Sequence, residues 1–217
     1  MTSTRRLEAV VIAATLGLAA VAWIFTLQRM RGMDMGAATG LGSLSFFIAI
    51  WVPMMGAMML PGAGPAVSRF VRDSGRALAG PVFTGSYLAV WASVGLAVYL
   101  LYRPHGTLVA GALTVAAGLY ELTPFKRYCR RRCRESVRSG FEFGAYCLGS
   151  SLGLMAMLVA LGVMSVTWMS LAAALVVAQK LLPPRPPIDV PVALAIAALG
   201  IVILAAPGWV PGLVPSM

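Results

Sequence analysis

The sequence predicts an all-α protein, a polytopic bundle of about seven transmembrane helices with its N-terminus in the cytoplasm. Hydrophobic residues make up 59% of the 217 residues, and the mean hydropathy is +0.86. Long apolar runs alternate with short loops along the chain. Because one transmembrane helix needs about 20 mostly apolar residues, seven of them leave little room for a soluble domain. We therefore expect a single integral-membrane domain over residues 1–217.

The distribution of charge predicts the orientation of this bundle. With the N-terminus inside, 14 of the 17 Lys and Arg residues fall in cytoplasmic loops, and only Arg29, Arg31 and Arg103 lie outside. Cytoplasmic loops retain Lys and Arg during insertion, so the bias predicts a multi-pass protein of the inner (plasma) membrane. The same loops account for the net charge of +10, which therefore does not indicate a nucleic-acid partner. The expected partners are the lipid bilayer and another membrane subunit or a soluble metal carrier.

The first three expected spans are residues 7–28, 43–61 and 81–102. The first begins like a secretory signal peptide, but its apolar run is longer than a signal core of roughly 7–15 residues. We interpret it as an uncleaved span. The second is expected to end at the proline-rich segment 61–65, because proline removes a backbone donor and interrupts a helix.

The remaining spans are expected at 107–124, 143–163, 166–182 and 190–207. The proline-rich segment 183–187 is expected to be extended between the last two. Only Met164 and Ser165 separate the fifth span from the sixth. If these two merged into one long helix, the C-terminus would move to the cytoplasmic side.

Methionine is the residue type that most suggests chemistry, with 13 in the chain. Met33 and Met35 flank Asp34 in the first outer loop, and residues i and i+2 of an extended segment point to the same side. Thioether sulfur is a soft ligand that selects Cu(I). In the second span, near its cytoplasmic end, two ridges with i, i+4 spacing are formed by Met54, Met55, Met58 and Met59. Methionine also fills irregular cores, and packing is the favoured interpretation of these ridges.

Cysteine offers a second group of candidate ligands. Cys129 and Cys133 would share a face on a helical extension of the fourth span, where two thiolates could hold Cu(I) or zinc with further ligands. The surrounding arginines should lower the thiol pKa values. An incidental pair is the alternative. Cys147 lies within the fifth span on one face with Ser151 and Met155, and Cys147 and Met155 are further candidate ligands.

Few ionisable residues lie within the expected spans. Glu121 is near the cytoplasmic end of the fourth span, where a carboxyl group is a functional candidate by default. Pairing with Lys126 or Arg127, one turn away, is the competing interpretation. His105 is the single histidine, so metal enzymes that need two or three histidines are excluded unless a partner supplies them. No hydrolytic triad or phosphate-binding glycine loop is visible, and we do not expect an enzyme.

Several segments resemble a family of bacterial integral membrane proteins that are described as metal-binding and connected with copper. The resemblance covers roughly 45–182 and is carried by the segments Trp51–Pro61, Tyr87–Trp91, Gly118–Lys126 with Cys129 and Cys133, Gly144–Gly149, Gly162–Met164, Trp168–Met169 and Lys180. It implies a membrane helix bundle that handles metal. The chain departs from the family pattern at Ser150 and Ser151, where cysteines are usual, and at Gln179, where glutamate is usual. The histidine often found between Cys129 and Cys133 is also missing, which leaves methionine as the main candidate ligand.

These observations favour a membrane-embedded protein that binds or passes a metal ion, with copper as the expected ligand. Two other classes stay open. A structural or assembly subunit of a membrane complex would use its methionines and helix glycines for packing. A small-solute transporter would need polar groups or broken helices near the membrane midplane, and Pro53 with its neighbouring glycines matches this in part.

Overall fold

The computed structural model describes residues 3–30, 40–76, 78–135, 138–163, 165–182 and 186–210. These residues form eight α-helices and one short 3-10 helix, so the predicted all-α class is confirmed. The elements are α1 (Ser3–Met30), α2 (Leu44–Ser74), α3 (Ala79–Leu101), α4 (Thr107–Glu121), α5 (Pro124–Arg134), α6 (Gly140–Leu161), α7 (Val166–Leu181), α8 (Pro186–Ala205) and η2 (Pro207–Trp209).

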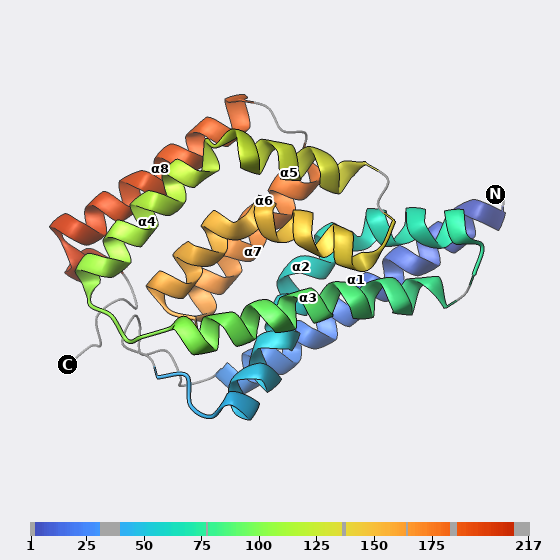
Figure 1. Ribbon diagram of the computed structural model, residues 1–217, viewed down its shortest axis with the longest axis horizontal. Coiled ribbons are helices and arrows are strands. Elements are labelled where there is room, and N and C mark those ends of the chain that lie inside the picture. Colours follow the sequence, from blue (N-terminus) through green and yellow to red (C-terminus); the bar gives the residue numbers. More distant parts are fainter. Residues whose placement is uncertain are drawn as a thin grey trace.

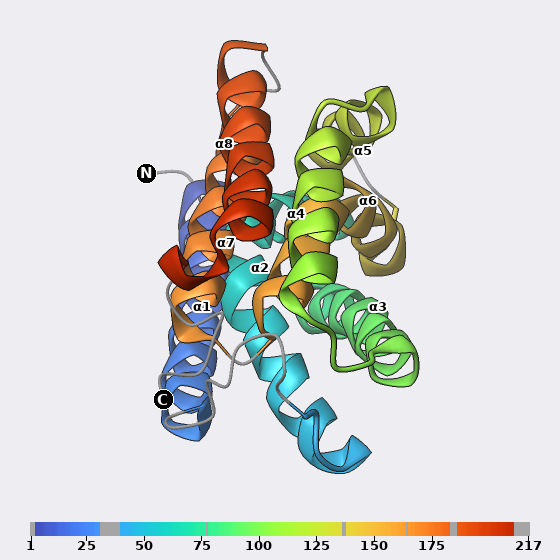
Figure 2. The ribbon, with the colours of Figure 1, turned by 90° about the vertical axis from the view of Figure 1, so that its left-hand side faces the viewer.

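The helices pack as one bundle with α2 and α6 at its centre (Figures 1 and 2). Helix α2 contacts α1, α3 and α7, while α6 contacts α3, α4, α5 and α7. Helices α4 and α8 lie along each other on one side. The N-terminus and the α2–α3 connection lie at the same end, where Arg72 and Glu8 form an ion pair of 2.6 Å between α2 and α1. We call this the inner end, because the charge pattern predicts that it faces the cytoplasm.

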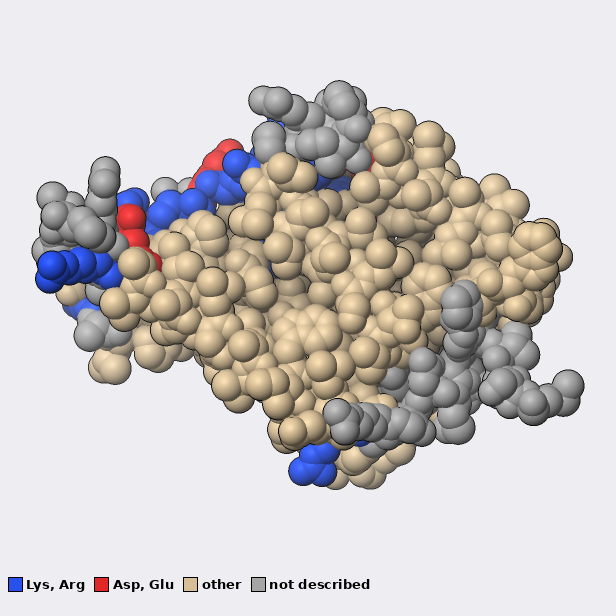
Figure 3. All heavy atoms as spheres, turned by 180° about the vertical axis from the view of Figure 1, so that it is seen from behind, with Lys and Arg blue, Asp and Glu red and all other residues tan. Residues whose placement is uncertain are grey.

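Four helices are long and apolar enough to cross a membrane: α1 from Glu8 onward, α2, α3 and α6. Helices α4 and α5 pass the same test only together, and they meet at a bend of 62°. Helices α7 and α8 are apolar but shorter, so the predicted count of seven spans is not confirmed. Most of the face drawn in Figure 3 is uncharged, and its charged groups gather along one edge, with one basic group opposite.

Helix α2 does not end at Pro61, and the prediction of a break at 61–65 was wrong. The helix continues to Ser74 and contains Pro53, Pro61 and Pro65. Proline is tolerated in such helices when neighbouring helices pack against the freed backbone. The small residues around these prolines permit that packing: an added Cβ at Gly62 would overlap the side chain of Lys180, and one at Gly64 would lie 3.3 Å from the Thr15 hydroxyl.

Helices α6 and α7 are separate, as predicted. The chain turns at Gly162, whose φ of 131° favours glycine. The expected extended segment at 183–187 is wrong in its second half, because α8 begins at Pro186. Proline suits the first helical turn, where its missing N–H would have no partner within the helix.

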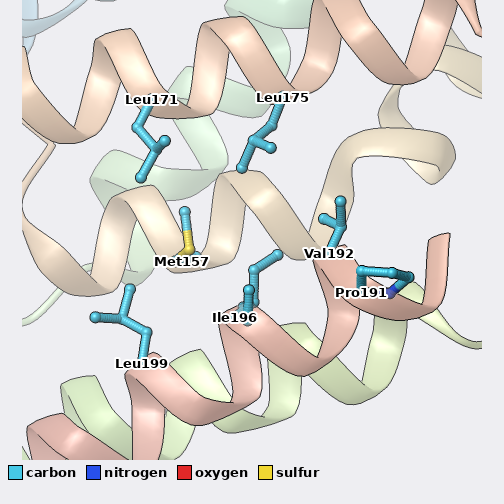
Figure 4. Close-up of a pocket in the computed structure, with 8 residues that line it drawn as sticks. Met157, Leu171, Leu175, Pro191, Val192, Ile196 and Leu199 are labelled. Atoms are coloured by element: carbon cyan, nitrogen blue, oxygen red, sulfur yellow. The ribbon is translucent and has the colours of Figure 1, made fainter. Parts of the chain in front are cut away.

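An apolar cavity of about 310 Å³ lies between α6, α7 and α8. Figure 4 shows Leu171 and Leu175 of α7 facing Ile196 and Leu199 of α8, with Met157 of α6 beside them. Apart from the Met157 sulfur, the labelled side chains offer no metal ligand. This cavity is therefore suited to hydrocarbon and not to an ion.

Candidate metal centre

The outer methionine site predicted from the sequence, Met33, Asp34 and Met35, lies outside the described residues. His105, on the same predicted side, is placed between two backbone carbonyl groups. Its Nδ1 lies 3.0 Å from the Arg103 oxygen and its Nε2 lies 3.1 Å from the Ala160 oxygen. The histidine thus connects the α3–α4 loop to the last turns of α6.

The four methionines of α2 are fully buried. Because α2 runs on to Ser74, Met54, Met55, Met58 and Met59 lie near its middle and not near its cytoplasmic end as predicted. Met59 is the one of these four that contacts Lys180 through both its sulfur and its carbonyl oxygen. The Nζ atom of Lys180 on α7 lies 3.7 Å from the Met59 sulfur and 3.5 Å from the Met59 carbonyl oxygen.

The predicted cysteine pair lies on a helix of its own. Residues Leu122 and Thr123 interrupt the chain after α4, and Thr123 caps α5 by accepting a hydrogen bond of 3.3 Å from the backbone N–H of Lys126. Pro124 occupies the first turn. Cys129 and Cys133 therefore do not continue α4, but they do share a face, and both are buried.

The prediction that arginines lower the thiol pKa values was wrong. Burial raises the pKa of Cys129, and burial together with the neighbouring Cys147 raises the pKa of Cys133 to about 12. Three arginines of α5 have partners other than the thiols: Arg130 pairs with Asp189, Arg132 pairs with Glu135, and Arg134 donates to the Leu181 carbonyl oxygen. Lys180 is the neighbouring cation that opposes the rise in the pKa of Cys133.

Cys147 and its predicted partners face the interior, since Cys147, Ser151 and Met155 are all buried. The Cys147 sulfur lies 3.2 Å from the Tyr87 hydroxyl of α3. Glycines make this contact possible, because an added Cβ at Gly144 would lie 2.8 Å from Val90 and one at Gly140 would overlap the Phe83 carbonyl oxygen. Helices α3 and α6 therefore approach closely beside Cys147.

Soft donors from three helices thus lie around Lys180 and Tyr87. Cys133 comes from α5, Cys147 from α6 and Met59 from α2, and the Lys180 ammonium is 3.4 Å from the Tyr87 hydroxyl that contacts Cys147. A small cavity of about 30 Å³ lies beside Cys133, Ser150 and Lys180, which is room for one water molecule or ion. We call Cys133, Cys147 and Met59 the inner sulfur cluster.

A buried polar network fixes α5, and with it Cys133, against α7 and α8. Lys126 pairs with Glu121, as one of the two interpretations of Glu121 predicted, and donates 2.9 Å to the Gln179 side-chain oxygen. Gln179 in turn donates 2.7 Å to Glu121. Arg130 pairs with Asp189 of α8 and donates 2.6 Å to the Gln179 carbonyl oxygen. Each charge in this network therefore has an opposite partner.

The donor types determine which metal the cluster fits. Among the described residues, no three His, Cys, Asp or Glu side chains group together as a metal site. Structural zinc usually takes four such ligands, so the inner sulfur cluster does not match a zinc site. Thiolate and thioether sulfur together suit Cu(I).

Two residues of this region had no predicted role. Tyr87 and Lys180 both lie in segments that carry the family resemblance, which is the only signal that singles them out. The contact between Tyr87 and Lys180 depends on how α3 and α7 pack in the bundle, and no local sequence pattern predicts that packing. Cys129 packs differently, because an added Cβ at Gly149 would lie 2.6 Å from its sulfur.

A comparison with protein families decides what kind of chain this is. The model of the family PpoB2, described as a copper chaperone, matches residues 48–203. The chain belongs to the PpoB2 copper chaperone family. The PpoB2 match contains every residue of the inner sulfur cluster and also Tyr87 and Lys180. No curated protein and no solved structure matches the chain in the corresponding comparisons.

Proposed function

We propose that this chain carries one Cu(I) ion as cargo, bound within a membrane by the thiolates of Cys133 and Cys147 with Met59 as a third donor. The observation that supports the proposal is that soft donors from three helices lie around Lys180 and Tyr87: Lys180 contacts the Met59 sulfur and the Tyr87 hydroxyl, Tyr87 contacts the Cys147 sulfur, and Cys133 lines the same small cavity as Lys180. Membership of a copper chaperone family supports copper as the metal. In the proposed orientation the N-terminus is cytoplasmic, and the cluster lies toward the inner end.

The methionines of α2 supply a route to this cluster. Met55 lies one helical turn from Met59 on the same ridge, and Met54 and Met58 form the ridge beside it. All four are buried, so an ion that moved along them would be kept from water and would exchange one soft ligand for another. The outer loop with Met33, Asp34 and Met35 is the proposed point of exchange with a soluble metal carrier.

Anaerobic Cu(I) binding to the detergent-purified chain, in competition with a chromogenic chelator, tests this function. The wild type is expected to bind one Cu(I). The Cys133→Ser, Cys147→Ser double variant is expected to bind Cu(I) more than about 100-fold more weakly. Removing a residue that only hydrogen-bonds to a metal ligand typically costs roughly 10–100-fold in metal affinity, and removing the ligands themselves should cost more.

Cys129→Ser is the matched control, since Cys129 is buried on the same helix but packs on Gly149. It should bind as the wild type does. Equal affinity of the double variant and the wild type would refute the site. A wild type that binds no Cu(I) would refute the function and favour a structural subunit with packing methionines.

A further inference from the structure

The ammonium group of Lys180 lies at the inner sulfur cluster, beside Met59 and Tyr87. Among the described residues, no carboxylate lies within ion-pair distance of it. Its hydrogen-bonding contacts are the Tyr87 hydroxyl at 3.4 Å, the Met59 carbonyl oxygen at 3.5 Å and the Met59 sulfur at 3.7 Å. These contacts are long for hydrogen bonds, so the charge is only weakly compensated.

The position of this charge is held by the packing around it. The Nζ atom lies 5.8 Å from the ring centres of both Tyr87 and Phe143, and aromatic faces attract cations at such distances. The glycine at position 62 leaves room for the lysine stem against α2, where any side chain would overlap it. Lys180 is thus directed toward the cluster and is partly buried.

The other cations near the cluster are already neutralised or exposed. Arg130 and Lys126 are buried, but each pairs with a carboxylate, Asp189 and Glu121 respectively. Arg134 reaches the same small cavity but is exposed, and it donates 3.2 Å to the Leu181 carbonyl oxygen. Among the described residues, Lys180 is therefore the cation that sets the net charge of the cluster.

The charges balance for a monovalent ion. When Cu(I) binds, the two thiols release two protons to water, and one positive metal charge with two thiolates leaves a net charge of −1. The ammonium of Lys180 brings the total to zero. A divalent ion such as Zn²⁺ with the same two thiolates is already neutral, so the ammonium would leave a charge of +1. Uncompensated charge in a buried site is costly.

We propose that Lys180 is a specificity-determining residue that makes the inner sulfur cluster favour monovalent soft ions over divalent ones. This inference rests on the proposed Cu(I) site. It adds that selectivity comes from charge as well as from the softness of sulfur. A neutral thioether donor such as Met59 raises the coordination number of the metal but does not change the net charge of the site.

Separate competition titrations with Cu(I) and with Zn²⁺ test the proposal on Lys180→Leu, Lys180→Gln and Lys180→Arg. The two neutral variants should bind Cu(I) at least about tenfold more weakly and Zn²⁺ more tightly, because a unit charge a few ångströms away acts strongly in a partly buried site. Lys180→Arg keeps the charge and should keep the wild-type ratio of affinities. Lys180→Gln serves if Lys180→Leu does not fold.

The outcomes separate this inference from the proposed function. If Cu(I) binding depends on Cys133 and Cys147 but the neutral variants keep the Cu(I)-to-Zn²⁺ ratio, the role of Lys180 is refuted and the site stands. If the neutral variants bind Cu(I) and Zn²⁺ equally more weakly, the role of Lys180 is also refuted, because such a result indicates a structural effect. If the wild type binds no Cu(I), the proposed function itself fails.

Discussion

Replacement of Lys126 by methionine is expected to lower the free energy of unfolding by about 3–5 kcal/mol. Lys126 and Glu121 are both buried, and Gln179 is the other residue that contacts both. Without the ammonium, the Glu121 carboxylate would stay buried with one amide donor, and its second oxygen has no hydrogen-bond partner among the described residues. Denaturation in mixed detergent micelles, followed by circular dichroism, measures the change.

Two controls isolate the effect of the broken pair. The double variant Glu121→Gln, Lys126→Met removes both charges and should recover most of the lost stability, because a buried ion pair contributes little net stability. Arg132→Gln breaks an exposed pair with Glu135 on the same helix and should change stability little. A Lys126→Met variant that is as stable as Arg132→Gln would contradict the expected cost of the broken buried pair.

The same substitution connects stability to the proposed copper site. Helix α5 carries Cys133, and its described contacts with α7 include the buried network around Gln179. A variant that loosens α5 should move Cys133 away from Cys147 and Met59. Lys126→Met is therefore also expected to weaken Cu(I) binding, and the double variant should restore both properties together.

The sequence predicts well those features of the fold that depend on residues close together in the chain. The separation of α6 from α7 was expected from two residues, and the shared face of Cys129 and Cys133 from their spacing. The pairing of Glu121 with Lys126 follows from their closeness along the chain. In each case the outcome depends on neighbours within about one helical turn.

The errors arise where packing between helices overrides a local preference. Proline normally interrupts a helix, yet α2 passes through Pro61 and Pro65 because Gly62 and Gly64 permit close packing on both sides. The same limit applies to the site. Cys133, Cys147 and Met59 are on three helices, and no periodicity in the sequence predicts that they lie around Lys180 and Tyr87.

Gly140→Ala is expected to destabilise the bundle by about 1–3 kcal/mol or more. The added methyl group would overlap the Phe83 carbonyl oxygen and the Ser86 hydroxyl of α3. A backbone oxygen cannot turn aside, so α3 and α6 must move apart at the inner end. Thermal unfolding in detergent measures the loss, and Cu(I) titration reports whether Tyr87 and Cys147 separate.

Gly85→Ala in α3 is the matched control, because nothing lies within 4 Å of the Cβ that it would add. Alanine favours a helix over glycine by up to about 1 kcal/mol, so this variant should be as stable as the wild type or more stable. The two glycine-to-alanine changes thus have opposite expected signs on two helices that contact each other. A stable Gly140→Ala variant with unchanged Cu(I) affinity would show that the close approach of α3 and α6 is not what holds Cys147 in the cluster.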